Sequence, residues 1–517
     1  MARNEQCKSV DERDSTLGKR LLYRRQFLLS REPVHELGEW KHLRIDKHFL
    51  YLHPDLELTV REENSVTAIL VGYIFDPRHP SKTNDEIIKD IISGSGGLGD
   101  LIGLLKFYVG RYALLYRDKN HFVCFHDAYG VREIYYCTQY NSVICGSQPN
   151  LLDRFSKPKL GITKDQDIVK FYKHEMKPVR LGRLWVGDET YVQDVKHLIA
   201  NHYLDIESLK AKRYWPNKRL EKINLSTGSR LSCSFLKGAI KAVTQRYNVM
   251  MAVTAGYDSR SLLAASRDVC DRIYYFINKE PGMNDQSADI RIPKNIFKKL
   301  NIPFHVHDVD GPVDEEFKNI YLNNAFWAIE KSLPTIFNVY FKNHQDKVNL
   351  LGLGEIGRVY YGDTPRDLDG YYLARSLKYK RSRYAVRQCE KWLLEAKKLG
   401  TTYNFDVMKL FLWEFLIANW GAIGNAESDI AIEEFDPYSS HYILEIMLSV
   451  DQRQGDIFRE MFRETWPELL EFPFNPPATA SDRMKELLNK TGLFQHVKNA
   501  KYRFDRWKYR RTINSGY

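Results

Sequence analysis

One segment constrains the fold of this chain more than any other: a five-residue apolar run that leads into a turn of small residues. The run occupies residues 249–253, the turn contains Thr254, Ala255 and Gly256, and a helical pattern follows at 261–267. An uninterrupted apolar run of this length is typical of a strand that is buried on both faces of a parallel sheet. Strand and helix patterns alternate around it, from a helix at 229–247 to a strand at 304–309. The sequence therefore predicts a doubly wound α/β domain.

The first part of the chain has a different pattern, made of short runs rich in β-branched and aromatic residues. Such runs lie at 67–74, 111–116, 122–126 and 134–137, with helical patches at 84–93 and 163–174. They predict a layered α+β sheet domain over residues 21–215, after a loose leader at 1–20. The α/β domain, with a mostly helical C-terminal part, is expected to occupy residues 216–517.

Composition narrows the class of protein only slightly. The chain has 77 Lys and Arg against 66 Asp and Glu, and this excess fits a polyanionic ligand such as ATP, a nucleic acid, or no specific partner. None of the seven cysteines forms a C-x-x-C pair, so reduced thiols are expected rather than a disulfide framework or a zinc site. The N-terminus lacks an apolar signal region, and the apolar stretch 410–420 is too short to cross a bilayer. We expect a soluble cytoplasmic protein with no membrane partner.

The turn after the apolar run has the chemistry of a phosphate site. Small residues let the backbone approach phosphate oxygens, and the first N–H groups of the following helix point at the ligand along a favourable dipole. Ser259 adds a hydroxyl donor, and Asp258 can hold a magnesium ion. An ordinary strand-to-helix turn, with Asp258 or Ser259 as the N-cap, is the alternative interpretation.

The turn Thr254-Ala-Gly-Tyr-Asp-Ser259 resembles the Ser-Gly-Gly-x-Asp-Ser pyrophosphate loop of asparagine synthetases and other PP-loop ATP pyrophosphatases. Thr254 keeps the hydroxyl of the family serine, whereas Ala255 replaces a glycine and therefore requires a negative φ or a shifted loop. Further similar segments follow the family's order. Residues 110–118 and 126–136 are similar to the glutaminase domain, 197–204 and 213–216 to the segment between the domains, and 435–438 with 444–450 to the helical region near the active site.

The resemblance implies an Ntn-hydrolase-like sheet domain followed by a PP-loop domain that uses ATP and Mg2+. In that family a small or conjugated carboxylate is activated as an acyl-adenylate and transferred to ammonia or an amine, with release of AMP and pyrophosphate. A homodimer is an open alternative, and nucleic acid is not expected as a partner. The implied magnesium ligands are Asp258 and Glu355, and Glu355 is also the implied base. The implied ATP-binding residues are Thr254, Ala255, Gly256, Tyr257, Asp258, Ser259 and Arg260.

Three departures from the family pattern bear on activity. Active glutaminases of the family have cysteine directly after the initiator Met, but here Ala2 follows and Cys7 would need specific cleavage, so we expect no glutamine hydrolysis. Of the acidic Gly-Glu-Gly-x-Asp-Glu motif only Glu355 remains as a carboxylate. The alternative interpretation is that Glu355 caps a helix. The family lysine position falls on Gly455 or Asp456. The candidate cations near the α-phosphate are Arg260, Arg358, Arg453 and Arg459.

Several alternatives stay open at this point. The run 274–277 is either a wall for adenine or a core strand, and Asp285 and Asp289 either face the nucleotide or are solvated. The protein as a whole is either an enzyme or a catalytically silent relative that binds a partner. Basic and aromatic residues interleave over 498–511, which would suit an RNA-modifying PP-loop enzyme or, alternatively, an amphipathic terminal helix with a solvated basic face.

Overall fold

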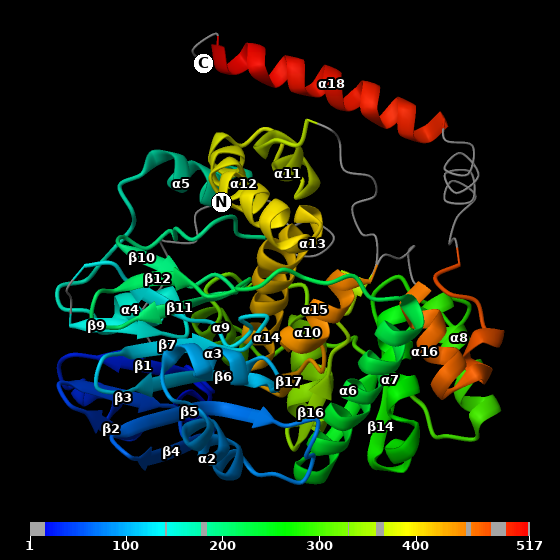
Figure 1. Ribbon diagram of the computed structural model, residues 1–517, viewed down its shortest axis with the longest axis horizontal. Coiled ribbons are helices and arrows are strands. Elements are labelled where there is room, and N and C mark those ends of the chain that lie inside the picture. Colours follow the sequence, from blue (N-terminus) through cyan, green and yellow to red (C-terminus); the bar gives the residue numbers. More distant parts are fainter. Residues whose placement is uncertain are drawn as a thin grey trace.

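The computed structural model describes residues 16–139, 142–176, 184–328, 330–357, 367–450, 456–476 and 493–514. Two antiparallel sheets are formed by residues before 216, which we call the N-terminal half, and a parallel sheet is formed by the C-terminal half. Figure 1 shows the N-terminal half in blue and cyan beside the green and yellow elements of the C-terminal half. The predicted combination of a layered sheet region and a parallel-sheet region is confirmed.

The N-terminal half contains two six-stranded sheets in which every strand pair is antiparallel. The first has the order β10-β8-β9-β1-β3-β2 and the second β12-β11-β7-β6-β5-β4. The strands are β1 (Phe27–Ser30), β2 (Lys41–Ile45), β3 (His48–Leu52), β4 (Leu58–Glu63), β5 (Val66–Phe75), β6 (Val109–Arg117), β7 (Phe122–His126), β8 (Tyr135–Cys137), β9 (Val143–Gly146), β10 (Val195–His197), β11 (His202–Asp205) and β12 (Lys210–Arg213).

Alternation along β5 explains the layers of this half. Ile69 and Val71 join the core between the two sheets, whereas Ala68 and Leu70 pack towards helices on the outer face. Those helices are α2 (Asn84–Gly94), which begins with a Thr83–Glu86 capping box, and α3 (Leu98–Leu105). Helix α4 (Pro149–Phe155) packs on the outer face of the first sheet. The result is a helix–sheet–sheet–helix arrangement.

The C-terminal half is built on a five-stranded parallel sheet of order β15-β14-β13-β16-β17. Its strands are β13 (Asn248–Ala252), β14 (Ile273–Lys279), β15 (His305–Asp308), β16 (Lys347–Leu350) and β17 (Glu433–Phe435). The chain moves outward from β13 in one direction to β15 and then returns to its other side with β16. The strand order therefore reverses at β13, and ligands of such sheets bind at the carboxyl ends of the strands at this point.

Helices cover both faces of this sheet. Val249 and Met251 face the core that includes α6 (Leu225–Arg246), α7 (Tyr257–Ala265) and α8 (Ala288–Leu300). Met250 faces the opposite core, with α9 (Glu315–Asn324), α10 (Leu333–Thr335) and η4 (Ile336–Phe341). Burial on both sides accounts for the uninterrupted apolar run in the sequence, and the doubly wound prediction is confirmed.

The remaining described elements are mostly helical, as the sequence predicts. In the N-terminal half they are α1 (Thr16–Leu21), η1 (His35–Leu37), α5 (Gln166–Lys170) and η2 (Phe171–Glu175). In the C-terminal half they are η3 (Arg267–Arg272), η5 (Glu355–Gly357), α11 (Gly370–Ser376), α12 (Arg383–Tyr403), α13 (Val407–Phe411), η6 (Leu412–Gly421), α14 (Ala422–Ser428), α15 (His441–Ser449), α16 (Asp456–Thr465), η7 (Pro467–Glu471) and α18 (Leu493–Asn514).

Two local expectations differ from the structure. The end of the expected loose leader forms α1, whose Leu21 is buried beside Met250 and Phe276 of the parallel sheet. The apolar stretch 410–420 belongs to the longer continuous helix Val407–Ser428, which among the described residues is the one helix with the length and composition of a membrane span. Because 78% of its most apolar window is buried inside the protein, this helix serves as a core element.

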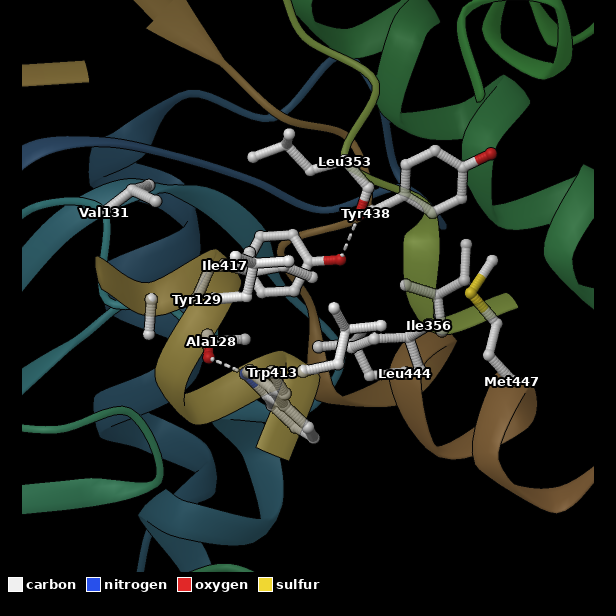
Figure 2. Close-up of a cluster of buried hydrophobic side chains, with 14 of the residues drawn as sticks. Ala128, Tyr129, Val131, Leu353, Ile356, Trp413, Ile417, Tyr438, Leu444 and Met447 are labelled. Atoms are coloured by element: carbon white, nitrogen blue, oxygen red, sulfur yellow. Dashed lines mark hydrogen bonds between the residues drawn. The ribbon is translucent and has the colours of Figure 1, made fainter. Parts of the chain in front are cut away.

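The two halves share one hydrophobic core. Figure 2 shows residues 128–131 of the N-terminal half packed against the long helix, where Trp413 Nε1 donates to the Ala128 carbonyl at 2.8 Å. The Tyr129 hydroxyl donates to the Leu353 carbonyl at 2.7 Å, just after β16. Contacts from the N-terminal half therefore reach the carboxyl edge of the parallel sheet.

A buried ionic network joins the halves as well. Arg111 on β6 binds both carboxylate oxygens of Asp429, at 2.6 and 2.7 Å. Arg132 and Arg25 bind Glu433 on β17. All five side chains are largely buried, so each charge depends on its partners for solvation.

Candidate functional site

The small-residue turn lies at the carboxyl end of β13, the strand at which the sheet order reverses. Helix α7 begins at Tyr257, four residues earlier than the helix at 261 that the sequence predicts, and Gly256 is its N-cap with φ −78° and ψ 170°. Gly256 offers no side-chain bond to the helix, and the amides of Tyr257, Asp258 and Ser259 belong to the first turn, where N–H groups have no intrahelical acceptor. This end of the sheet therefore presents backbone donors and a positive helix dipole.

Hydrogen bonds within the turn fix its shape. The Thr254 amide donates to Ser259 Oγ at 3.0 Å, and the Gly256 amide donates to Thr254 Oγ1 at 3.1 Å. The hydroxyl that Thr254 shares with the family serine is thus used inside the loop. Ala255 is buried and is not among the non-glycine residues with positive φ, so its methyl group fits without a left-handed backbone.

A third residue outside the turn anchors it. The Ala255 amide donates to Asp289 Oδ1 at 2.9 Å. Asp289 thereby has a supporting role that differs from both alternatives of the sequence analysis, while the exposed Asp285 pairs with Lys294 at 2.9 Å. The amides of Thr254, Ala255 and Gly256 all have protein acceptors, which leaves the first turn of α7 as the donor surface for an anion.

The segment after β16 passes directly against this turn. A Cβ built on Gly352 would lie 3.1 Å from the Asp258 carbonyl carbon and 3.2 Å from the Ser259 nitrogen, and one on Gly354 would lie 3.2 Å from Asp258 Oδ1. At Gly352 the neighbouring atoms belong to the backbone of the turn, whereas at Gly354 they belong to the side chains of Tyr438 and Asp258. The close passage brings Glu355, at the start of η5, to the same place as Asp258. The two predicted magnesium ligands are therefore neighbours in the fold.

Asp436 is a third carboxylate at this edge, and sequence reasoning did not single it out. It follows β17, is fully buried, and accepts hydrogen bonds from the amides of Leu353 at 3.1 Å and Tyr438 at 2.9 Å. Burial raises the pKa of Asp436 well above its usual value, and the negative charges of Glu355 and Asp258 raise it further. An acidic residue directly after a strand, within the segment 435–438 already noted for its resemblance, was the available signal.

The residues of this edge suit a magnesium ion. The structure has no group of three or more His, Cys, Asp or Glu side chains at metal-binding distance among the residues it describes. Magnesium in nucleotide sites is usually held by one or two carboxylates, with phosphates and water as the other ligands. Asp258 and Glu355 could supply those carboxylates, and a cation would offset the negative charges that add to the effect of burial on the pKa of Asp436.

The candidate cations differ in where their side chains lie relative to the turn. Arg260 is fully buried and donates to the carbonyls of Leu469, Phe472 and Pro473, so its guanidinium holds the segment 469–473 rather than facing the turn. Burial lowers the pKa of Arg260 to about 9, with a further decrease from Arg459. Arg260 is therefore a structural residue in this fold, and its contribution to the donor surface is its backbone.

Arg459 on α16 remains close to the turn. Its Nη2 donates to the Tyr257 hydroxyl at 2.8 Å, and its guanidinium lies 5.1 Å from the centre of the Phe474 ring. Phe474 stacks on Tyr257 with ring centres 4.5 Å apart. The other two candidate cations, Arg358 and Arg453, lie outside the described residues.

The run 274–277 is a core strand rather than an open wall for adenine. Tyr275 and Phe276 are buried in β14, on opposite faces of the sheet. The Tyr275 hydroxyl is hydrogen-bonded to Ser266 Oγ at 2.8 Å, and Tyr274 stacks on His305. These rings are already in contact with protein groups, which supports the core-strand alternative.

Five of the six cysteines among the described residues do not have the properties of nucleophiles. Burial raises the pKa of Cys124, Cys137 and Cys233 to about 12, and it raises those of Cys145 and Cys389 further. A nucleophilic thiol needs a lowered pKa and an accessible site. Cys7, the residue discussed for glutamine hydrolysis, lies outside the described residues.

The basic and aromatic stretch 498–511 lies within α18, which Figure 1 shows along one side of the molecule. One face of α18 is bound to the C-terminal half: the Tyr502 hydroxyl donates to Asp369 at 3.0 Å, and Arg506 pairs with the same carboxylate at 2.6 Å. Phe504 and Trp507 are 62% and 51% exposed on the helix. The helix is amphipathic as expected, although its exposed side includes two aromatic residues.

Comparisons with known proteins give weak similarities. No protein-family model matches the sequence, and no curated protein matches it. Among solved structures, the chain is similar to an allosteric regulatory enzyme of purine biosynthesis (11% identity, TM-score 0.25, covering 57% of this chain and 78% of the other). It is similar to a glutamine-dependent NAD+ synthetase from Acinetobacter baumannii in complex with ADP (12% identity, TM-score 0.15, covering 26% and 28%). It is also similar to the U34-tRNA thiolase NcsA from Methanococcus maripaludis with its 4Fe–4S cluster (10% identity, TM-score 0.20, covering 55% and 80%). Likenesses this weak establish neither the fold nor the function of this chain.

Proposed function

We propose that this protein is an asparagine synthetase-like, ATP-dependent ligase that activates a carboxylate as an acyl-adenylate and transfers it to ammonia or an amine. One observation carries the proposal. The turn 254–259 places the first turn of α7, which includes Asp258, at the carboxyl end of the central strand and close to the segment that carries Glu355. An anion-binding helix start and acidic side chains at a switch point of a parallel sheet are what a magnesium–nucleotide complex requires.

The roles of the residues follow from their positions. The backbone amides of Tyr257, Asp258 and Ser259 would bind the outer phosphates of ATP, which leave together as pyrophosphate. Asp258 and Glu355 would hold magnesium, which when bound neutralises negative charge on the phosphate oxygens. Arg459, whose Nη2 donates to the Tyr257 hydroxyl, would stabilise charge on the departing group.

The nitrogen donor is proposed to be ammonia or an amine rather than glutamine. The described thiols of the N-terminal half, on Cys124, Cys137 and Cys145, are buried, and burial raises their pKa values. The N-terminal half instead supports the site, because Tyr129 holds the Leu353 carbonyl two residues before Glu355. Its two-layered antiparallel sheets fit an Ntn-hydrolase-like domain that has kept its architecture.

ATP–pyrophosphate exchange tests the proposal. The purified protein would be incubated with ATP, Mg2+ and labelled pyrophosphate across a panel of carboxylic acids, and AMP would be measured with ammonium or glutamine present. We expect exchange with at least one acid, and AMP formation that ammonium increases and glutamine does not. If the protein binds ATP but no acid supports exchange, the catalytically silent alternative is favoured.

Charge-neutral variants connect the activity to the site. Asp258→Asn and Glu355→Gln should each lower exchange at least a hundredfold, because each removes a magnesium ligand of the proposed site. Asp285→Asn is the matched control, since Asp285 is an exposed aspartate of the same half and pairs only with Lys294 among the contacts described here. Equal activity of all three variants would contradict the assignment.

A further inference from the structure

A cavity lies next to the segment that follows β16. The phosphate-binding turn lies against the same segment. It has a volume of about 310 Å³ and is lined by residues from the ends of β14, β16 and β17 and from the helix Val407–Ser428. Leu351 and Leu353 line it, and Gly352 between them contacts Asp258 and Ser259. The cavity and the turn are therefore separated by the thickness of a single backbone segment, residues 351–353. The volume of the cavity suits a small organic molecule.

The charged groups of the lining are mostly acidic, and hydroxyl and amide side chains make up the rest of its polar part. Three carboxylates face the cavity, from Glu280, Glu427 and Glu434, against the single ammonium of the exposed Lys331. Asn278 also lines it, and its buried Oδ1 accepts no hydrogen bond within the described part of the chain. Such a lining favours a ligand that donates hydrogen bonds and carries positive charge.

Among these carboxylates, Glu434 gives the strongest indication of a cationic ligand. It is 5% exposed, receives a hydrogen bond from Ser428 Oγ at 2.9 Å, and has Asn349 Nδ2 at 3.5 Å. The Oδ1 of Asn349, a residue that is 1% exposed, has no donor among the described residues. Burial raises the pKa of Glu434 to about 7, and a cation beside it would stabilise the charged form of this carboxyl.

The rest of the lining is apolar and aromatic. Trp420 and Ile423 come from the long helix, Ile336 comes from η4, and Leu353 closes the side towards the turn. Apolar walls of this kind would pack against a carbon skeleton, while the carboxylates recognise one charged end. A bare divalent ion would not use these walls.

We propose that this cavity binds the amine substrate: a small primary amine whose ammonium group is recognised by Glu434, Glu427 and Glu280 and whose carbon skeleton packs against Trp420 and Ile423. This inference rests on the proposed function in naming the bound amine as the nucleophile of amide formation. The ammonium group first gives one proton to a carboxylate of the lining, and the free amine nitrogen then bonds to the acyl carbon. The bond from that carbon to the phosphate oxygen breaks, AMP leaves with its electron pair, and the new amide nitrogen loses its surplus proton to water. Its position next to the turn would place the amine beside an acyl-adenylate held at α7.

Saturation-transfer NMR on the full-length protein tests the cavity directly. The probes are n-butylamine and n-butanol, which share a carbon skeleton and differ in charge. We expect saturation transfer to n-butylamine, competed by other primary amines, and at least tenfold weaker transfer to n-butanol. Equal transfer to the two probes would overturn the proposal.

Variants identify the residues. Glu434→Gln keeps the shape of the side chain and should weaken n-butylamine binding at least tenfold, and Glu280→Gln, at a half-buried position, gives a second variant that is easier to fold. Glu221→Gln, at an exposed loop position, is the control and should bind like the wild type. Wild-type affinity in both cavity variants would overturn the proposal.

The exchange assay separates this inference from the proposed function. Exchange with an acid, together with no charge preference in the NMR experiment, would reject the amine cavity and keep the ligase. Amine binding that depends on Glu434, without exchange for any acid, would support the cavity and reject the ligase.

Discussion

Replacing Gly352 with alanine tests how the acidic segment and the phosphate-binding turn fit together. A Cβ at this position would lie 3.1 Å from the Asp258 carbonyl carbon and 3.2 Å from both the Asp258 oxygen and the Ser259 nitrogen. Ordinary contacts begin at about 3.4 Å, so the two backbones must separate by a few tenths of an ångström. The atoms that must move include the Ser259 amide, which the proposed function assigns to phosphate binding.

The magnitude follows from that amide. A hydrogen bond to a charged group contributes about 1.5–3 kcal/mol, so losing one aligned donor should weaken ATP binding by roughly tenfold to a hundredfold. Overpacking of this size costs about 1–3 kcal/mol of folding stability, which a protein of this size can tolerate. Isothermal titration of the variant with ATP and Mg2+ would measure the loss of affinity.

Gly103→Ala is the matched control, because Gly103 lies inside α3 and a Cβ there would meet nothing within 4 Å. The control should bind ATP like the wild type and gain about 0.5–1 kcal/mol of stability from the better helix former. If Gly352→Ala binds ATP as tightly as the wild type, the Ser259 amide does not contribute to phosphate binding as we infer.

Three further predictions concern the structure around the site. Glu133 is fully buried and its pKa is raised from 4.5 to about 7, so the wild type loses stability as the pH rises from 4.5 through 7. Glu133→Gln should remove this loss. In urea unfolding, the free energy of unfolding of the variant minus that of the wild type should rise by up to about 3 kcal/mol from pH 4.5 to pH 8. A difference that does not change with pH would contradict the burial of a titrating carboxyl. Arg111→Met should cost about 3–5 kcal/mol in urea unfolding, because it leaves Asp429 buried without its bidentate partner, and a cost below about 1 kcal/mol would show that the network does not join the halves. Arg260→Met should expose the segment 469–473 to limited proteolysis, since three of its carbonyls lose their donor, whereas weaker ATP binding with unchanged cleavage would indicate a phosphate contact instead.

Local burial patterns made the architecture readable from the sequence. The run 249–253 is apolar at every position because Val249 and Met251 face one core and Met250 the other. The start of α7 was harder to place, since Tyr257, Asp258 and Ser259 are weak helix formers, and the prediction began the helix at 261. Those residues form the first turn of α7. The position of this turn is set more by where the preceding strand β13 ends than by the helix propensity of its residues.

The long helix was underestimated for a related reason. Only 410–420 stands out as apolar in the sequence, although the helix runs from Val407 to Ser428. Glu414, inside that stretch, is buried and paired with Arg213 of the N-terminal half at 2.6 Å. Trp392 also donates to Glu414. Polar residues that are satisfied by distant partners look like helix ends in a sequence, because periodicity does not show those partners.

The site shows the same division between local and long-range information. Gly256, Asp258 and Ser259 could be singled out because their turn is continuous in the sequence. The sequence left the role of Asp289 open and did not single out Asp436, because each reaches the site through tertiary contacts with the turn or with Leu353. The direction of a long side chain was equally hidden, and Arg260 points to carbonyls on 469–473 although its backbone belongs to the turn.

A crystal structure with a non-hydrolysable ATP analogue and Mg2+ tests the central claim most directly. We predict that the two outer phosphates accept hydrogen bonds from the backbone amides of Tyr257, Asp258 and Ser259, with the metal held by Asp258 and Glu355. Phosphates bound elsewhere on the protein, with no ligand at the start of α7, would contradict the account.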